Sequence, residues 1–365
     1  MISRQPSHGF GRGRPVVATG LPAWRQAAVV GTWLEIANTA NGPSQIDAYS
    51  GVAWREDILE LTGLACGGHQ DSADNSVNSI SLLADTPGST GWFQRCAPSP
   101  AVAFGNHYNA DGKPASRHTY NQPFWHPILG RYILAGSRNV YDAGGNDAHG
   151  YIDGFDPLTN TWDPQGTYAE ITTTPVFQGY GQVMDGVNGE IWTHGQRVWN
   201  PTSNAVTYPS VGGSGMATEH TAAFDKSRRK IFTLQYGNGE GSDGPSVICN
   251  DFDCATRVGS AVTISASAAY SQWLAAAPAY AALVYDSLND RWLFYHGYGA
   301  EAGVVYAISA TGSTRTMTIL ATVGTPATVP ASGAGLNKRF HYSESLKGCV
   351  LMPKQTANLW FLRTT

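Results

Sequence analysis

The sequence has little charge, few lysines and no long apolar run. Of its 365 residues, 14% are charged, and lysine occurs at only six positions. A net charge of −4 argues against a nucleic-acid partner, because duplex binders are strongly basic. No segment approaches the roughly 20 apolar residues of a membrane-spanning helix. The first twenty residues lack the apolar core of about 7 to 15 residues that marks a secretory signal, so we expect no signal peptide and no membrane insertion.

Cysteine is also scarce. The five cysteines are an odd number and form no CxxC pair, which argues against a disulfide framework and against a zinc site. We expect small buried thiols within strands. A single bridge, such as one between Cys249 and Cys254, stays open at this point.

Catalytic motifs are missing as well. The sequence contains no Walker motif, no nucleophile elbow and no HExxH segment. Its "TNTW" and "STGW" segments end like the repeated boxes of sialidases but lack the preceding Asp-x-Gly. The sequence therefore favours a protein that is not an enzyme and that carries no metal and no cofactor.

Turn formers and aromatic residues are abundant instead. Glycine occurs 42 times and proline 20 times, beside 17 tyrosines, 12 phenylalanines and 11 tryptophans. Glycine and proline supply tight turns, and aromatic residues favour strands. The composition predicts an all-β fold with many short strands.

One hairpin pattern occurs six times. Each copy has an apolar strand, one polar residue, a short turn and a second apolar strand, as in "AALVYDSLNDRWLFYHGYG" at 281–299. The copies lie 40 to 71 residues apart, and a period of about 40 to 50 residues with four strands is typical of a propeller blade. The six central polar residues are Arg55, His126, Asp185, Asp225, Asp286 and Ser343.

Further strands complete the predicted blades. The segments 150–164 and 197–210 each read as a third strand, a turn and a fourth strand with an aromatic residue. After the last hairpin, "ANLWFLRTT" supplies only a third strand, and "VVGTWLEIAN" around Trp33 offers the missing fourth. We predict a six-bladed β-propeller of four-stranded antiparallel blades, with the last blade closed by the N-terminal strand.

Glycines after second strands and late aromatics carry a family resemblance. They occur in "ACGGHQDSADNSV", "AGSRNVYDAGG", "YHGYG" and "NTW". With these features the chain resembles a kelch-type β-propeller, over about residues 24–365. The predicted organisation is a basic arm at 1–20 and one propeller domain at 21–365.

In such a fold a ligand site is expected where the innermost strands begin, around the central channel. The candidates there carry charged, histidine or tyrosine side chains that suit a polar ligand, a general base or plain channel lining. They are Arg117, His118, Tyr180, Glu219, His220, Lys338 and Arg339.

Two other features allow more than one interpretation. The oxygen-rich loop at 69–75 suits a hard cation such as calcium, but a solvated turn rich in Asp and Asn explains it as well. Several tryptophans could stack on sugars, although most are expected to pack between sheets.

The arm at 1–20 favours an assembly role. Arg4, Arg12 and Arg14 precede the first acidic residue, Glu35, and the segment has little to bury, so we expect it to be disordered when free. Together with the missing enzyme motifs, this resembles virion proteins of tailed bacteriophages. The leading hypothesis is a structural or binding component of a phage tail or fibre, located in the virion, with other virion proteins or a cell-surface glycan as partners. A bacterial carbohydrate-binding or carbohydrate-acting propeller and a general kelch interaction module are the alternatives.

Overall fold

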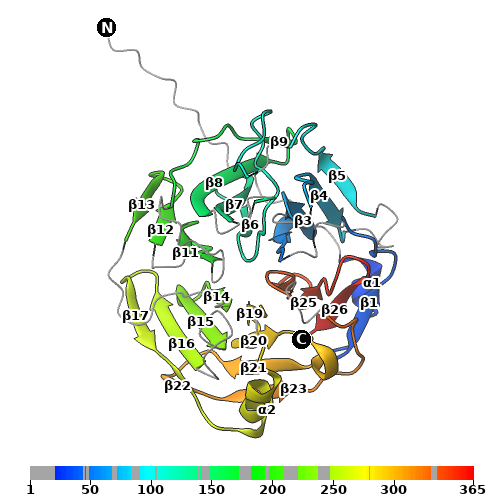
Figure 1. The fold of residues 1–365 in the computed structure, drawn as a ribbon. Coiled ribbons are helices and arrows are strands. Elements are labelled where there is room, and N and C mark those ends of the chain that lie inside the picture. Colours follow the sequence, from blue (N-terminus) through cyan, green and yellow to red (C-terminus); the bar gives the residue numbers. More distant parts are fainter. Residues whose placement is uncertain are drawn as a thin grey trace.

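The computed structural model describes most of the chain, and the predicted arm at 1–20 lies outside the described part. The described residues are 21–43, 46, 49–67, 72–83, 91–102, 105–138, 140–141, 148–171, 182–193, 197–208, 221–236, 247–278, 280–329 and 335–365. Six four-stranded antiparallel sheets are arranged around a centre, which confirms the predicted six-bladed, all-β propeller (Figure 1).

The first three blades follow the chain from inside to outside, so that the first hairpin strand of each lies innermost. Blade 1 contains β2 (Ala53–Arg55), β3 (Glu60–Leu64), β4 (Val77–Ser81) and β5 (Phe93–Cys96). Blade 2 contains β6 (Pro123–His126), β7 (Arg131–Arg138), β8 (Ala148–Asp156) and β9 (Thr161–Trp162). Blade 3 contains β10 (Val183–Met184), β11 (Ile191–Thr193), β12 (Arg197–Asn200) and β13 (Ala205–Thr207).

Blades 4 and 5 have the same strand order as the first three, whereas blade 6 takes its outermost strand from the beginning of the described chain. Blade 4 contains β14 (Thr221–Asp225), β15 (Lys230–Tyr236), β16 (Val247–Asp253) and β17 (Val258–Ala261). Blade 5 contains β19 (Ala282–Asp286), β20 (Arg291–Tyr295), β21 (Val305–Ser309) and β23 (Met317–Leu320). Blade 6 contains β24 (Phe340–Ser343), β25 (Gly348–Leu351) and β26 (Leu359–Arg363), and β26 pairs with β1 (Trp33–Ile36) in the register Trp33 to Leu362.

All six hairpins share one turn geometry. The fourth residue after each central polar residue adopts a positive φ, between 47° and 63° for five of them and 73° for Gly189. Where the polar residue is aspartate, its carboxylate caps the turn, as Asp185 does by accepting from the backbone N–H of Val187 at 2.8 Å. The repeated sequence pattern therefore encodes a repeated backbone. The residues with positive φ are Leu59, Gly130, Gly189, Arg229, Asp290 and Lys347.

The hydrophobic core is divided among the blade interfaces. Six clusters of buried apolar side chains lie between successive blades, and one of them joins blade 6 to blade 1 through Phe361 and Leu61. The interface of blades 4 and 5 has the largest cluster, whose fully buried members include Trp273 and Trp292. Burial between blades holds the ring together, since each sheet covers its faces with its neighbours.

The connection between blades 4 and 5 contains elements that the hairpin pattern does not predict. There, β18 (Thr263–Ile264) pairs in parallel with β22 (Thr314–Arg315), and α2 (Ala268–Ala276) follows β18. Ser267 caps α2 by accepting from the N–H of Tyr270 at 3.0 Å. Trp273 reaches the core from this helix, although tryptophans were expected mainly on strands.

The remaining helical elements are short. In the described part of the chain they include α1 (Ala23–Gln26), η2 (Glu56–Ile58) and η4 (Gly299–Glu301). Within the described residues, no helix combines the length and the apolar character that crossing a bilayer requires. All five cysteines are free thiols, four of them buried, so Cys249 and Cys254 do not form the bridge that the sequence left open.

Candidate functional site

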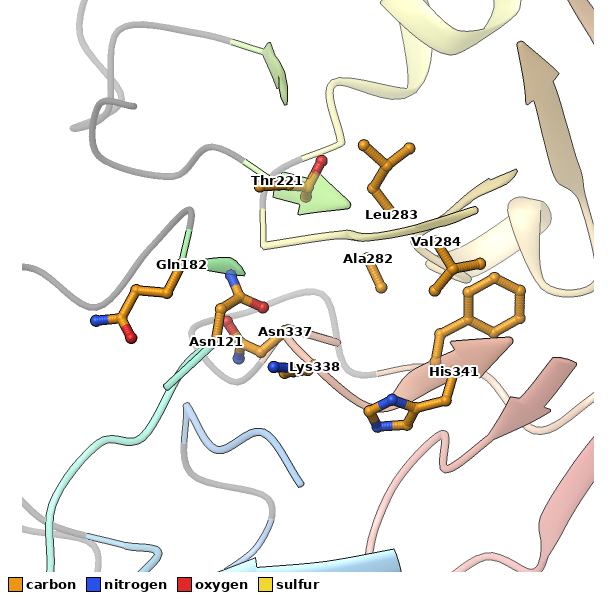
Figure 2. A pocket seen from close by; sticks show the side chains of 11 residues that line it. Asn121, Gln182, Thr221, Ala282, Leu283, Val284, Asn337, Lys338 and His341 are labelled. Carbon is orange, nitrogen blue, oxygen red and sulfur yellow. The ribbon is translucent and has the colours of Figure 1, made fainter. Parts of the chain in front are cut away.

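Two adjoining cavities occupy the centre of the propeller. The smaller has a volume of about 60 Å³, and Figure 2 shows the side chains around it. The larger has a volume of about 310 Å³ and is lined by residues of all six innermost strands. The two cavities form one continuous site along the channel, because six residues line both: Gln182, Ala222, Leu283, Val284, Lys338 and His341.

The larger cavity is lined by one side chain from the same repeat position in every blade. This position directly precedes the central polar residue of each hairpin and carries an aromatic residue or methionine six times. All six side chains are partly buried. We call this set the channel ring: Trp54, Trp125, Met184, Phe224, Tyr285 and Tyr342.

Strand alternation explains why these residues meet at the channel. Along β14, Thr221, Ala223 and Asp225 are buried, whereas Ala222 and Phe224 retain partial exposure. Because side chains alternate across a strand, the ring residue packs into the interface with the preceding blade while its edge remains open to the channel. The sequence alignment of the six hairpins already contains this signal.

Specific contacts with neighbouring residues fix the ring side chains. The indole N–H of Trp54 donates to Glu56 Oε2 at 2.6 Å. The Arg55 guanidinium of blade 1 lies over the Trp125 ring of blade 2, 3.9 Å from its centroid. The Tyr285 hydroxyl donates to Asp290 Oδ1 at 2.6 Å. These contacts hold the side chains of Trp54, Trp125 and Tyr285 in place.

Lys338 carries the cationic group of the cavity. It lies five residues before Ser343, and Asn121 holds the same position before His126 and lines the same space (Figure 2). The Lys338 amine lies 3.1 Å from the centroid of the Phe124 ring. Burial lowers the pKa of Lys338 well below its ordinary value, because an apolar environment disfavours the charged amine.

Two buried polar groups beside Lys338 have atoms without a partner among the described residues. Gln182 is 2% exposed, and its amide nitrogen donates to the carbonyl of Ala135 at 2.7 Å while its Oε1 has no partner. His341 is 7% exposed, stacks on Trp54 at 6.3 Å and has no partner for Nε2. Burial, and secondarily the charge of Lys338, lowers the pKa of His341 to about 3, so this imidazole is neutral near pH 7.

The described lining contains no aspartate and no glutamate. A general acid and base pair of carboxylates is thus not formed by these residues, and no group of three metal-ligating side chains occurs in the described chain. What the site does offer is a broad aromatic surface at one end and amide, hydroxyl, imidazole and amine groups at the other. Such a combination suits binding of a small molecule.

The predicted site residues Arg117 and His118 have other surroundings. Arg117 is 0% exposed and donates to Asp153 Oδ2 at 3.1 Å, and Tyr108 donates to the other oxygen of this carboxylate at 2.7 Å. His118 is buried among aromatic side chains and its Nδ1 lies 3.2 Å from the Tyr120 hydroxyl. Neither residue lines the cavities.

Of the two other predicted residues that the structure describes, Lys338 lines the channel site and Arg339 does not. Arg339 is buried and donates to the backbone carbonyls of Leu336 and Gly335. Tyr180, Glu219 and His220 lie outside the described residues, as do Arg4, Arg12 and Arg14 of the arm. In the sequence, Tyr180 and His220 share the repeat position of Lys338 in blades 3 and 4.

The loop at 69–75 is described only in part. Asp74 Oδ1 accepts from the N–H of Ser76 at 2.8 Å, which is the geometry of an Asx turn. Asn75 is buried, and its amide donates to Ser99 and to the carbonyl of Pro114. His69 and Asp71 lie outside the described residues, so the calcium hypothesis stays a prediction.

Comparison with known proteins adds little to this description. No protein family and no curated protein matches the sequence. Of solved structures, 298 chains match, among them one from "Crystal Structure of Mitotic Checkpoint Complex". That alignment covers 91% of each chain with 10% identity and a TM-score of 0.45. The strand pairing described above is what defines the fold.

Proposed function

We propose that this protein is a non-enzymatic binding protein whose central channel holds a small ligand against the channel ring. The observation that carries this proposal is the cavity of about 310 Å³ with one partly buried aromatic or methionine side chain from each blade. Small-molecule sites commonly measure about 300 to 1,000 Å³ and combine an apolar lining with a few polar groups. A β-propeller fold is compatible with such a binding or interaction role.

A ligand screen with ring variants tests this proposal. Saturation-transfer NMR would identify binders from a set of aromatic acids, amides and mono- to tetrasaccharides. Phe224→Ala and Met184→Ala should weaken any channel ligand, whereas Leu158→Ala, which alters an exposed side chain in the blade 2 turn, should not. Binding that is unchanged in both ring variants would contradict the channel as the site.

The biological setting that we propose is a tailed-phage virion, in which residues 1–20 dock the propeller into the tail or fibre. Support comes from the sequence alone: the arm has three arginines, a fourth, Arg25, follows it before the first acidic residue, and the arm has no apolar segment. A basic arm suits an acidic partner surface. The kelch-type resemblance belongs to the same proposal, and its glycines at 68, 144 and 145 lie outside the described residues.

Deletion of residues 1–20 tests the docking role. The shortened chain should fold with an unchanged melting temperature and be lost from purified virions, as measured by mass spectrometry. A matched control replaces Arg4, Arg12 and Arg14 with lysine, which keeps the charge. Incorporation of the shortened chain at full copy number would contradict the docking role.

A carbohydrate ligand is the second candidate, and the aromatic ring is what favours it. Partly exposed aromatic faces stack on sugar rings, and amide side chains such as Asn121 and Gln182 can bind hydroxyl groups. Glycan-array binding that disappears in Trp54→Ala would support this candidate, and an array without signal would count against it.

A further inference from the structure

Lys338 has the surroundings of an amine that awaits an anionic partner. Its side chain is partly buried, and its amine lies 3.1 Å from the centroid of the Phe124 ring. The ring face attracts a cation but cannot accept the strong hydrogen bonds that an ammonium group donates. Among the described residues, no side chain forms an ion pair with Lys338.

The described charges around Lys338 do not compensate it. The lining of both cavities contains no acidic residue, and the adjacent Arg339 is directed to backbone carbonyls. The other titratable groups that face the site are His341 on β24, whose pKa is lowered to about 3, and the ring tyrosines Tyr285 and Tyr342, whose pKa values are raised. None of these carries a negative charge near pH 7.

Two residues that line the smaller cavity have buried polar atoms without a partner among the described residues. Gln182 Oε1 and His341 Nε2 are both buried and unpaired among the described residues, and Asn121 and Asn337 lie beside them (Figure 2). Buried polar atoms in a folded protein normally have a hydrogen-bond partner. The Lys338 amine and the amide N–H groups of Asn121 can donate to a carboxylate, whereas Gln182 Oε1 can only accept a hydrogen bond.

The opposite part of the cavity is apolar. There the channel ring surrounds the larger volume of about 310 Å³, together with Phe124, Val183 and Leu283. A ligand that fills both parts must have a charged head and an apolar body. This volume is near the lower limit for ligand sites, so the cavity cannot fully enclose a ligand with a long chain.

We infer that the channel binds an organic carboxylate with an apolar body, with the carboxylate at Lys338 and the body within the channel ring. This inference rests on the proposed channel-binding function and adds the chemistry of the ligand. An aromatic or aliphatic acid and an acidic sugar share this chemistry. The bound carboxylate supplies Lys338 with a counter-ion that the described residues do not provide, and the paired lysine binds as ammonium.

Isothermal titration calorimetry with matched ligand pairs tests the inference. The probes are 4-phenylbutyrate and its uncharged amide for the aromatic source, and glucuronate and glucose for the sugar source. We expect the carboxylate of one pair to bind at least about tenfold more tightly than its uncharged partner, because charge-assisted hydrogen bonds are the stronger ones. Carboxylate affinity should increase as the pH falls from 9 to 7, since Lys338 then becomes protonated more readily.

Lys338→Met tests the charge and Ala222→Phe tests the shape of the cavity, with Lys226→Met as the control. Lys338→Met keeps the length of the side chain and should remove the tenfold preference and its pH dependence while leaving the affinity for the amide or glucose unchanged. Lys226→Met, which alters an exposed lysine in the blade 4 turn, should leave both affinities unchanged. Ala222→Phe fills both cavities and should abolish binding of every probe, with folding of each variant verified by circular dichroism.

The outcomes distinguish this inference from the proposed function. Equal affinities for a carboxylate and its uncharged partner, both lost in Ala222→Phe, would overturn the carboxylate inference and leave the channel as a binding site. Binding of 4-phenylbutyrate or glucuronate that survives in Ala222→Phe would overturn both, because the ligand would then lie elsewhere. The absence of binding by both carboxylates at millimolar concentration would also overturn the inference.

Discussion

The two ends of the central channel use aromatic side chains to opposite effect. Where the innermost strands begin, Tyr49, His118, Tyr120 and Tyr280 pack on one another with ring centroids 4.6 to 5.8 Å apart. Where these strands end, the channel ring side chains leave a cavity of about 310 Å³ between them. Among the described residues, the first end is filled by ring-on-ring contacts, and we call it the closed end; at the second end, which we call the ligand end after the proposed function, the side chains surround open volume.

The backbone accounts for this difference. Ring residues lie on strands, so the six-fold arrangement of the blades keeps them apart. Tyr49, Tyr120 and Tyr280 each lie six residues before the central polar residue and adopt a φ between 40° and 48°. Bulky residues rarely take this left-handed conformation, at a cost of about 1–2 kcal/mol each. Aromatic content alone therefore does not decide where a channel is open.

The largest expected effect concerns the closed end. Arg117→Met should lower the free energy of unfolding by about 3–5 kcal/mol, because it leaves the buried Asp153 carboxylate without its ion-pair partner. Burial raises the pKa of Asp153, so protonation should restore part of the loss as the pH falls. Urea unfolding at pH 7 and pH 5 measures both effects. A loss below 1 kcal/mol at pH 7 would mean that the ion pair does not hold this end together.

Acidification should lower the stability of the protein, because the buried imidazole of His341 at the ligand end stays neutral. The folded state keeps His341 neutral down to about pH 3, whereas an unfolded histidine has a pKa of about 6.5. The unfolded chain thus binds the extra proton as the pH falls below about 6.5, and stability decreases by up to about 1.4 kcal/mol per pH unit. His126 and His296 also have lowered pKa values and act in the same direction. In His341→Phe the decrease in the free energy of unfolding between pH 6 and pH 4 should be smaller. An identical decrease, measured by denaturant titration at each pH, would contradict this.

The two ends should also respond differently to truncation. Phe224→Ala in the channel ring should weaken ligand binding about tenfold and cost about 1–2 kcal/mol of stability, since the ring is only partly buried. Tyr120→Ala at the closed end should cost about 3 kcal/mol and leave affinity unchanged, because Tyr120 is buried away from the cavity. Calorimetry measures the ligand affinities of the two variants, and thermal unfolding measures their stabilities. Loss of binding in Tyr120→Ala would contradict the expected difference between the two ends.

Glycine should rescue the closed end in part. At a φ of 40°, Tyr120→Gly should be about 1 kcal/mol more stable than Tyr120→Ala, although glycine is normally the less stable of the two. Both variants lose the same aromatic contacts, so the difference reports the backbone alone. If the alanine variant has the higher melting temperature, position 120 is not strained.

The sequence predicted the repeated parts of this molecule well. The six hairpins, their central polar residues and the four-stranded blades follow from periodic patterns and turn chemistry that are local in the chain. The insertion with α2 was missed because its alanine-rich segment has no counterpart in other blades, and its helical state depends on packing of Trp273 into a core formed by distant strands.

Prediction of the site was less complete. Ligand sites are expected where innermost strands begin, and of the residues predicted there Lys338 lines the cavity. Arg117 and Arg339 were predicted on the same ground, but they are buried in structural contacts. Burial of this kind depends on partners far along the chain, such as Asp153. The channel ring was overlooked although its signal is local: the residue before each central polar residue is aromatic or methionine in all six hairpins.

A crystal structure of the protein with 4-phenylbutyrate tests the central claim most directly, namely that six equivalent residues converge on one ligand site. We expect density for the acid within the channel, with its phenyl group among Trp54, Phe224 and Tyr285 and its carboxylate within hydrogen-bond distance of the Lys338 amine. Ring side chains that point away from the channel, or a ligand bound only outside it, would contradict this account.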